Sequence, residues 1–242
     1  MKIIQVENQV EGGKVALELL KEKLAQGAKT LGLATGSSPE EFYKQIVESD
    51  LDFSEMTSVN LDEYVGLAED DPQSYHRFMH ENLFNHVNMR RDRIFFPNGM
   101  AADAAREAED YEARIAAAGG IDMQLLGIGR NAHIGFNEPD DAFARTTHKV
   151  ALKESTIEAN ARFFSSAAEV PREAMSMGIG TIFRARHIVL LASGAEKAEA
   201  VRDAVEGTIT PRVPASILQL HPCVTLIVDH AAGALLSGKS EP

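Results

Sequence analysis

The loop at residues 127–139 combines an imidazole and a carboxylate with several glycines. It reads GIGRNAHIGFNEP, so that Asn131 comes before His133 and Glu138 follows it. Glycine lets a backbone approach a ligand closely, and the charge of histidine changes readily near neutral pH. Acid–base chemistry is therefore one interpretation of this loop. The other is an ordinary loop with a hydrogen-bonded histidine and a solvated carboxylate, and the loop alone fits both.

A second pair of candidate groups follows the strand expected at residues 56–61. Asp62 and Glu63 come directly after this segment. In open parallel sheets, ligands bind outside the carboxyl ends of the strands, so an acid at this point is well placed for proton transfer. One of the two acids could equally cap the next turn.

Thr35, Gly36, Ser37 and Ser38 follow the strand expected at residues 30–34. We expect Ser38 to be the N-cap of a helix and the proline after it to be the first helical residue. Free N–H groups at a helix start, together with these hydroxyls, can hold a phosphate without a basic sequence. A capped helix that binds nothing has the same pattern, and the lysine of a Walker loop is missing.

Lys197 lies in the first turn of another expected helix, after the sequence SGAE at residues 193–196. A cation at this point opposes the helix dipole and is mildly unfavourable. An anion that neutralises the lysine would account for its position, whereas a solvated surface lysine needs no ligand.

The segments that must position these groups alternate between apolar runs and amphipathic stretches. We expect strands at residues 2–6, 30–34, 56–61, 93–97, 121–128, 187–192 and 223–229, and an extended segment at 146–152. Helices are expected between them, including residues 72–84, with Tyr75 and Phe78 in the core, and residues 101–118. A short helix is expected at the end of the chain. This order predicts one α/β domain over residues 1–242, with a doubly wound, mostly parallel, Rossmann-like sheet and helices on both faces.

The composition argues against several classes of protein. The chain has 242 residues, a formal net charge of -12 and a sequence pI near 5.1, which does not fit a surface for nucleic acid or an anionic membrane. Cys223 is the only cysteine; we expect it in the core, in a reducing compartment. No segment has the length of a membrane span, and the amino terminus lacks the apolar core of a signal peptide. We therefore expect a cytoplasmic protein.

Seven short motifs occur in order along nearly the whole chain. They are LATGSSP at 33–39, NLDEYVGL at 60–67, SYHRFM at 74–79, GIGRNAHIGFNEP at 127–139, ANARFF at 159–164, GAEKA at 194–198 and LQLHP at 218–222. Each motif alone is weak, but together they closely resemble the glucosamine-6-phosphate deaminase (isomerase) family. The resemblance favours the functional interpretation of the loops.

This resemblance implies conversion of D-glucosamine 6-phosphate and water to D-fructose 6-phosphate and ammonia, with no cofactor and no metal. It implies that Asp62 moves a proton between C2 and C1 of the sugar through an enolamine intermediate. His133 would open the pyranose ring, with Asn131 and Glu138 orienting its imidazole.

The resemblance also implies a phosphate site in this acidic chain. The phosphate would lie on the loop at residues 35–38 and would be held by two cations, Arg162 and Lys197. Members of the family range from monomers to hexamers, and the sequence identifies no subunit interface. A monomer and a homo-oligomer therefore both remain open.

Three features depart from the family pattern. Asn131 stands where some members have aspartate, which removes one negative charge beside His133. Ala132 stands where glycine is usual; if its φ is positive, alanine brings strain of about 1 kcal/mol. Thr147 and Lys149 stand near the positions where longer members activated by N-acetylglucosamine 6-phosphate have an arginine and a lysine. We therefore expect no activation, or weak activation, by that sugar.

Three alternative functions remain open. A galactosamine-6-phosphate deaminase would differ only in the C4 epimer of its substrate, and that choice depends on the shape of the pocket. A 6-phosphogluconolactonase-like hydrolase shares a glycine-rich loop with histidine, but it would not need Asp62. A non-catalytic sugar-phosphate sensor would keep the pocket without turnover, although Asp62 and His133 are both present.

Overall fold

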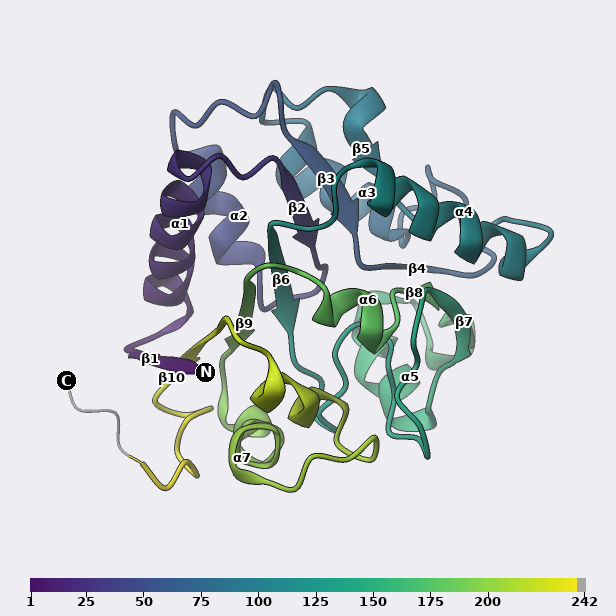
Figure 1. Cartoon of the computed structure of the whole chain (residues 1–242). Helices are drawn as coiled ribbons and strands as arrows, with labels where there is room; N and C mark the ends of the chain where they lie inside the picture. Colours follow the sequence, from purple (N-terminus) through teal and green to yellow (C-terminus); the bar gives the residue numbers. More distant parts are fainter. Residues whose placement is uncertain (239–242) are drawn as a thin grey trace.

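The computed structural model describes residues 1–238, which form a seven-stranded parallel sheet with helices on both faces (Figure 1). The strands are β1 (Lys2–Val6), β2 (Thr30–Leu33), β3 (Thr57–Asn60), β5 (Ile94–Phe95), β6 (Met123–Gly127), β9 (Ile188–Ala192) and β10 (Val224–Asp229). Their order in space is β1-β10-β9-β6-β2-β3-β5, and all neighbouring pairs are parallel. The predicted doubly wound sheet is confirmed, and each of the expected parallel strands is present.

Helices connect these strands. The α-helices are α1 (Gln9–Ala25), α2 (Glu40–Val47), α3 (Tyr75–Met79), α4 (Ala104–Ala117), α5 (Glu154–Asn160), α6 (Ile179–Phe183) and α7 (Ala198–Glu206). A π-helix, His80–Phe84, continues α3, and 3-10 turns lie at Arg91–Arg93, Ala161–Phe163, Ala167–Glu169, Ala195–Lys197 and Pro214–Leu220. None of the helices in residues 1–238 has the length and hydropathy that crossing a membrane would require.

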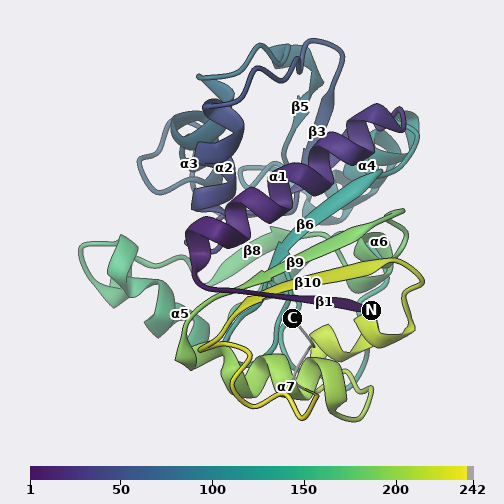
Figure 2. The same ribbon diagram turned by 90° about the vertical axis from the view of Figure 1, so that its left-hand side faces the viewer.

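Two sets of apolar side chains pack the helices on the two faces of the sheet. Successive residues of a strand point to opposite faces. In β6, Leu125 belongs to the cluster that contains α1, α2 and α3, whereas Leu126 belongs to the cluster that contains α4, α6 and α7. Figure 2 shows α1 and α7 on opposite sides of the strands. The central strands are therefore buried on both faces, as their apolar sequences predict.

A second, antiparallel sheet begins where β3 ends. Its strands are β4 (Asp62–Tyr64), β8 (Glu173–Ser176) and β7 (His148–Ala151), in the order β4-β8-β7. Asp62 is paired with Ser176, and the N–H of Met177 donates to the carbonyl of Leu61 at 2.9 Å. The expected extended segment at 146–152 is thus β7. Nothing in the sequence predicted β8, because its four residues, EAMS, lack an alternating pattern.

Two helix starts near the site differ from the prediction. The carbonyl of Pro39 accepts the first helical hydrogen bond, from Tyr43 N at 3.0 Å, so Pro39 is the N-cap of α2. The prediction that Ser38 is the N-cap is therefore wrong. Helix α3 begins later than expected, because Ser74 caps it by accepting from Arg77 N at 3.0 Å.

The last strand and the segment after it also correct two predictions. Residues 230–238 form turns, in which Gly233 N donates to Asp229 O at 2.9 Å and Leu236 N donates to Gly233 O at 3.1 Å. The short helix expected after β10 is absent from the described residues. Cys223 is half-buried rather than part of the core.

Candidate functional site

A cavity of about 610 Å³ lies at the carboxyl ends of the parallel strands. The chain runs from β2 to β3 and β5, then returns to β6 and continues to β9 and β10, so the strand order reverses between β2 and β6. A crevice at such a reversal is the usual ligand site of an open parallel sheet. The loops after β2, β3, β6 and β9 all contribute to its walls. No group of three metal-binding side chains occurs in the part of the chain that the structure describes.

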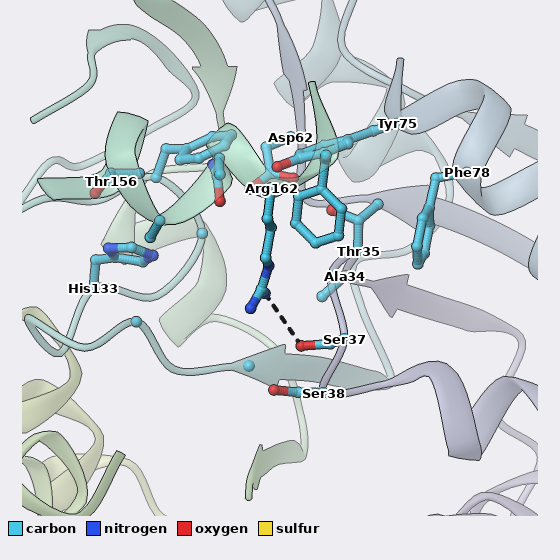
Figure 3. A pocket seen from close by; sticks show the side chains of 18 of the residues that line it. Ala34, Thr35, Ser37, Ser38, Asp62, Tyr75, Phe78, His133, Thr156 and Arg162 are labelled. Atoms are coloured by element: carbon cyan, nitrogen blue, oxygen red, sulfur yellow. Dashed lines mark hydrogen bonds between the residues drawn. The ribbon is translucent and has the colours of Figure 1, made fainter. Parts of the chain in front are cut away.

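Of the predicted site residues, all but one line this cavity. Those in its wall are Thr35, Gly36, Ser37, Ser38, Asp62, Asn131, His133, Arg162 and Lys197. Glu138 is not in the wall; it is buried behind His133 and is 7% exposed. Figure 3 shows Asp62, His133 and Ser37 facing the same space from different walls.

Asp62 is a nearly buried acid that faces the cavity. It is 6% exposed and is the first residue of β4. Burial raises the pKa of Asp62 well above its ordinary value, and the Glu63 carboxylate next to it adds to the effect. A carboxyl group with a raised pKa can hold and release a proton closer to neutral pH.

His133, Glu138 and Asn131 form a connected group at the end of β6. Nδ1 of His133 lies 3.5 Å from Oε2 of Glu138. Asn131 Nδ2 donates to the same oxygen at 2.7 Å, and Asn131 Oδ1 accepts from the backbone N of His133 at 3.2 Å. Burial alone would raise the pKa of Glu138, but His133, Thr156 and Asn131 outweigh it and lower the pKa to about 2. Glu138 is therefore a carboxylate at neutral pH, placed to orient the imidazole.

A tight turn presents the imidazole to the cavity. Ala132 N donates to Gly129 O at 3.0 Å, and Gly129 N donates to His133 O at 2.9 Å. A Cβ on Gly129 would lie 2.3 Å from the His133 ring, so this close approach requires glycine. Ala132 has φ 64 and is the only non-glycine residue with a positive φ in residues 1–238. The strain expected for alanine at this position is therefore present.

The loop after β2 exposes hydroxyls to the cavity and is held from two sides. Gly36 has φ 90, which allows the sharp turn after the strand. The side-chain amide of Gln9, at the start of α1, donates to the carbonyl of Ser37 and, at 3.3 Å, to that of Ser38. From the opposite wall, Arg162 Nη2 reaches the hydroxyl of Ser37 at 3.5 Å (Figure 3).

Three cations line the same cavity, and the sequence predicted only two of them. Arg162 and Lys197 were expected, whereas Arg130, in the loop after β6, was not. Burial lowers the pKa of Lys197; Glu196 opposes this effect, and Arg130 and Arg162 add to it. None of the three cations forms an ion pair with a carboxylate of the described residues. Cations gathered in this way favour an anionic ligand.

An aromatic wall completes the cavity. The ring of Tyr75 stacks on Phe136, with centroids 5.9 Å apart, and lies 4.8 Å from the ring of Tyr64. The Tyr64 hydroxyl accepts from Asn160 Nδ2 at 2.9 Å and lies 3.3 Å from the Tyr75 hydroxyl. Tyr75 and Phe78 were expected in the core, but both line the cavity. Their helical spacing gave no signal of this, because a cavity wall and a core face have the same pattern.

Known proteins have sequences similar to this one. Residues 11–226 match the family of glucosamine-6-phosphate isomerases/6-phosphogluconolactonase. The chain belongs to this family. A protein of Streptococcus sanguinis (strain SK36) named glucosamine-6-phosphate deaminase is 62% identical over 236 residues, which cover 98% of this chain and 99% of that protein. A protein of the same name from Streptococcus pneumoniae serotype 4 is 60% identical over 236 residues, which cover 98% of this chain and 100% of its relative.

Solved structures of the family share the fold. The structure of a monomeric glucosamine-6-phosphate deaminase has a TM-score of 0.94 and 44% identity, and the match covers 97% of this chain and 100% of the other. A 6-phosphogluconolactonase from Trypanosoma cruzi has a TM-score of 0.78 and 21% identity, covering 98% of this chain and 97% of the other. At that identity the likeness concerns the fold alone. Proteins with two different activities therefore share this architecture, so the activity has to be inferred from the residues of the site and not from the fold.

Proposed function

We propose that this chain is a glucosamine-6-phosphate deaminase, which converts D-glucosamine 6-phosphate and water to D-fructose 6-phosphate and ammonia. The observation that carries the proposal is that an acid, Asp62, and an imidazole, His133, line one cavity together with three cations. A volume of about 610 Å³ is enough for a hexose phosphate. The high identity to proteins named as this deaminase supports the same conclusion.

His133 opens the sugar ring. Nδ1 faces Glu138 at 3.5 Å, which leaves the other ring nitrogen for the substrate. The imidazole passes a proton to the ring oxygen as the bond between C1 and that oxygen breaks, and the C1 hydroxyl gives its proton to water as it becomes the aldehyde. Glu138 and Asn131 are positioning residues. Glu138 lies next to Nδ1 of the imidazole, and Asn131 accepts a hydrogen bond from the backbone N of His133.

Asp62 then carries the isomerisation. It removes the proton from C2 while the C1 carbonyl oxygen takes up a proton from water, which gives an enolamine, and it then returns its own proton to C1. Water then attacks the resulting iminium carbon at C2, and the C–N bond breaks to release ammonia and leave the ketone. A nearly buried acid suits this shuttle, because little solvent is available to exchange the proton it carries.

The phosphate occupies the polar part of the cavity. It lies on the hydroxyl loop at residues 35–38 and is gripped by Arg162 and Lys197. Arg130 supplies a third positive charge, which suits a dianion. These groups explain how a chain with a net charge of -12 binds an anionic substrate.

Ammonia release from glucosamine 6-phosphate tests the proposal. The wild-type protein should release ammonia, and Asp62→Asn should lower kcat by about 100-fold or more while substrate binding is retained. Hydrolysis of 6-phosphogluconolactone without ammonia release would instead identify a lactonase. Binding without any turnover would identify a sensor, and faster turnover of galactosamine 6-phosphate would reassign the epimer.

We further propose that residues 1–242 form one cytoplasmic domain that acts as a monomer. The solved deaminase at 44% identity is described as monomeric, which supports this state over a homo-oligomer. The single cysteine suits a reducing compartment. Sedimentation of the purified protein at the mass of one chain, 26.3 kDa, is the expected result, and a larger particle would contradict it.

No activation by N-acetylglucosamine 6-phosphate, or weak activation, is expected, because Thr147 and Lys149 stand near the effector positions where activated members have an arginine and a lysine. Both residues also have partners within the chain. Thr147 donates to Glu112 Oε1 through its backbone N at 2.8 Å and its hydroxyl at 2.7 Å. Lys149 forms an ion pair with Glu173 at 2.9 Å. A titration with this sugar at subsaturating substrate should leave the half-saturation concentration unchanged. A clear fall would show that an effector site exists.

A further inference from the structure

Glu63 is a buried carboxylate that the proposed mechanism does not use. It follows Asp62 in β4 and is 2% exposed. Neighbouring residues of a strand point to opposite faces, and accordingly Asp62 lines the cavity whereas Glu63 does not. A buried carboxylate is unfavourable unless hydrogen bonds replace those of water. The partners of Glu63 therefore indicate what it does.

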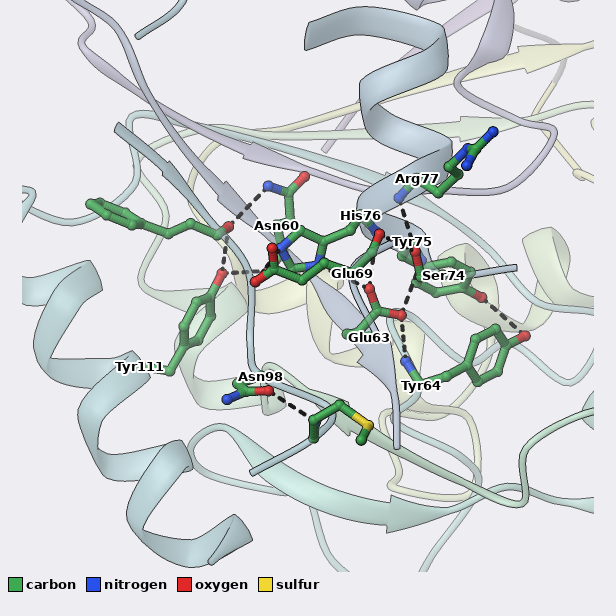
Figure 4. A network of polar contacts seen from close by, with 12 residues as sticks. Asn60, Glu63, Tyr64, Glu69, Ser74, Tyr75, His76, Arg77, Asn98 and Tyr111 are labelled. Atoms are coloured by element: carbon green, nitrogen blue, oxygen red, sulfur yellow. Dashed lines mark hydrogen bonds and ion pairs between the residues drawn. The ribbon is translucent and has the colours of Figure 1, made fainter. Parts of the chain in front are cut away.

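These partners come from β4 itself and from the first turn of α3 (Figure 4). Oε1 of Glu63 accepts from Tyr64 N at 2.8 Å and from Tyr75 N at 3.0 Å. Oε2 accepts from His76 N at 2.9 Å and lies 3.2 Å from Nδ1 of the His76 ring. One carboxylate thus ties the start of α3 to the strand that carries Asp62.

The His76 ring is held in turn by its own surroundings. It stacks on Phe96, with centroids 3.7 Å apart, and its Nε2 lies 3.7 Å from the exposed carboxylate of Glu69. The ionisable groups that face Glu63 among the described residues are therefore His76 and, beyond it, Glu69. Asp62 is its neighbour on the same strand but points to the opposite face. The hydroxyls of Tyr64 and Tyr75 lie further along the aromatic wall.

The anchored turn carries a wall of the active site. Tyr75 lines the cavity beside Asp62 (Figure 3), and its ring stacks on Phe136, with 10° between the ring planes. Phe136 belongs to the loop that bears His133. A displacement of α3 would therefore reach both proton-transfer groups through this aromatic contact.

We propose that Glu63 is a positioning residue of the deaminase, which fixes the first turn of α3 to β4 and thereby holds Tyr75 beside Asp62. This inference rests on the proposed function. It assigns a role to the second acid of the Asp62–Glu63 pair. From the sequence, this acid could serve in proton transfer or could cap the next turn. Glu63 also acts on Asp62 through space, because its negative charge adds to the burial that raises the pKa of Asp62.

Two substitutions separate the effect of the Glu63 charge from the effect of its side-chain length. Glu63→Gln removes the charge and places an amide where N–H groups now donate. We expect kcat for ammonia release to fall about tenfold or more, with a smaller change in KM. The acidic limb of the kcat–pH profile should also move to lower pH, because Asp62 loses a like-charged neighbour. Glu63→Asp keeps the charge but withdraws the carboxylate from α3, so kcat should fall while the acidic limb stays in place.

Glu112 provides the matched control. Its Oε1 accepts from Thr147 N at 2.8 Å, and its Oε2 lies 2.8 Å from Arg184 Nη2, so it also gathers donors, but it does not line the cavity. Glu112→Gln should lower the unfolding midpoint in denaturant and leave kcat and the acidic limb unchanged.

The outcomes are distinct. A folded Glu63→Gln variant with wild-type kcat and an unmoved acidic limb would overturn the inference. So would a fall in kcat with no movement of the limb, since the loss of a merely structural contact predicts that result. If Glu63→Gln does not fold, Glu63→Asp decides: wild-type kcat in that variant overturns the role. Failure of the proposed function would be seen separately, as the absence of ammonia release by the wild-type protein.

Discussion

The substitution Ala132→Gly tests whether the turn at residues 129–133 stores backbone strain. Ala132 has φ 64 and is 3% exposed. Glycine would relieve left-handed strain of about 1–2 kcal/mol. It would also increase the entropy of the unfolded chain, which costs about 0.4–1 kcal/mol, and it would remove a buried methyl group worth about 0.8 kcal/mol. These contributions nearly cancel, so we expect the free energy of unfolding to change by less than about 1 kcal/mol.

Ala200→Gly is the matched control. Ala200 is also 3% exposed, but it lies inside α7 at an ordinary negative φ. The substitution relieves no strain, and it should cost about 1 kcal/mol in helix propensity and about 0.8 kcal/mol in lost burial. Denaturation in urea, followed by circular dichroism, gives the free energy of unfolding of both variants. The control should be less stable than Ala132→Gly by about 1 kcal/mol or more.

The comparison can refute the reasoning directly. If Ala132→Gly loses as much stability as Ala200→Gly, no strain is relieved and the turn tolerates alanine freely. Ammonia release should persist in Ala132→Gly, because the hydrogen bonds of the turn are made by the backbone rather than by the methyl group.

Two further predictions concern a buried histidine and the third cation. Burial, aided by Lys23 and His221, lowers the pKa of His187 to about 4, so this ring is neutral in the folded protein. The contribution of the neutral ring to the free energy of unfolding is fully present above the unfolded pKa of about 6.5 and is lost as the pH falls toward 4. At pH 5 the loss is about 2 kcal/mol. His187→Gln should remove this part of the pH dependence of the denaturation midpoint, and an equal loss of stability in variant and wild type between pH 7 and pH 5 would contradict the assignment. Arg130→Gln should raise KM for glucosamine 6-phosphate by about tenfold or more, as expected for loss of a charge-assisted hydrogen bond, and should weaken inhibition by inorganic phosphate. Arg145→Gln, which removes an arginine outside the cavity, should change neither quantity, and an equal effect of both substitutions would exclude a specific contact.

Much of the architecture could be predicted because the central strands are buried on both faces. Segments such as residues 121–128 and 223–229 are mostly apolar, which is typical of strands that are buried on both faces of a parallel sheet. The convergence of Asp62 and His133 follows from the same fact, because the carboxyl ends of parallel strands meet at one edge. The sequence alone therefore predicts that these two side chains lie at one site.

The parts that escaped prediction depend on contacts between distant segments. The start of α2 was misplaced because Gln9, from a remote helix, holds the carbonyls of Ser37 and Ser38 and shapes the turn before the helix. Arg130 is exposed, and a sequence does not tell where an exposed arginine points. Strand β8 is too short for its pattern to be recognised, and it becomes a strand only because β4 and β7 pair with it on either side.

Strand β8 limits which parts of the site can be altered to accept a different substrate. Ser176, at the end of β8, pairs with Asp62, and its hydroxyl also accepts from the backbone N of Phe136 at 3.0 Å. The next carbonyl, that of Met177, accepts from Asn137 Nδ2 at 2.8 Å. Strand β8 thus fixes the gap between the Asp62 carboxyl group and the loop that carries the His133 imidazole. New substrates are therefore more easily accommodated by altering the walls supplied by α3 and α5 than by altering this gap.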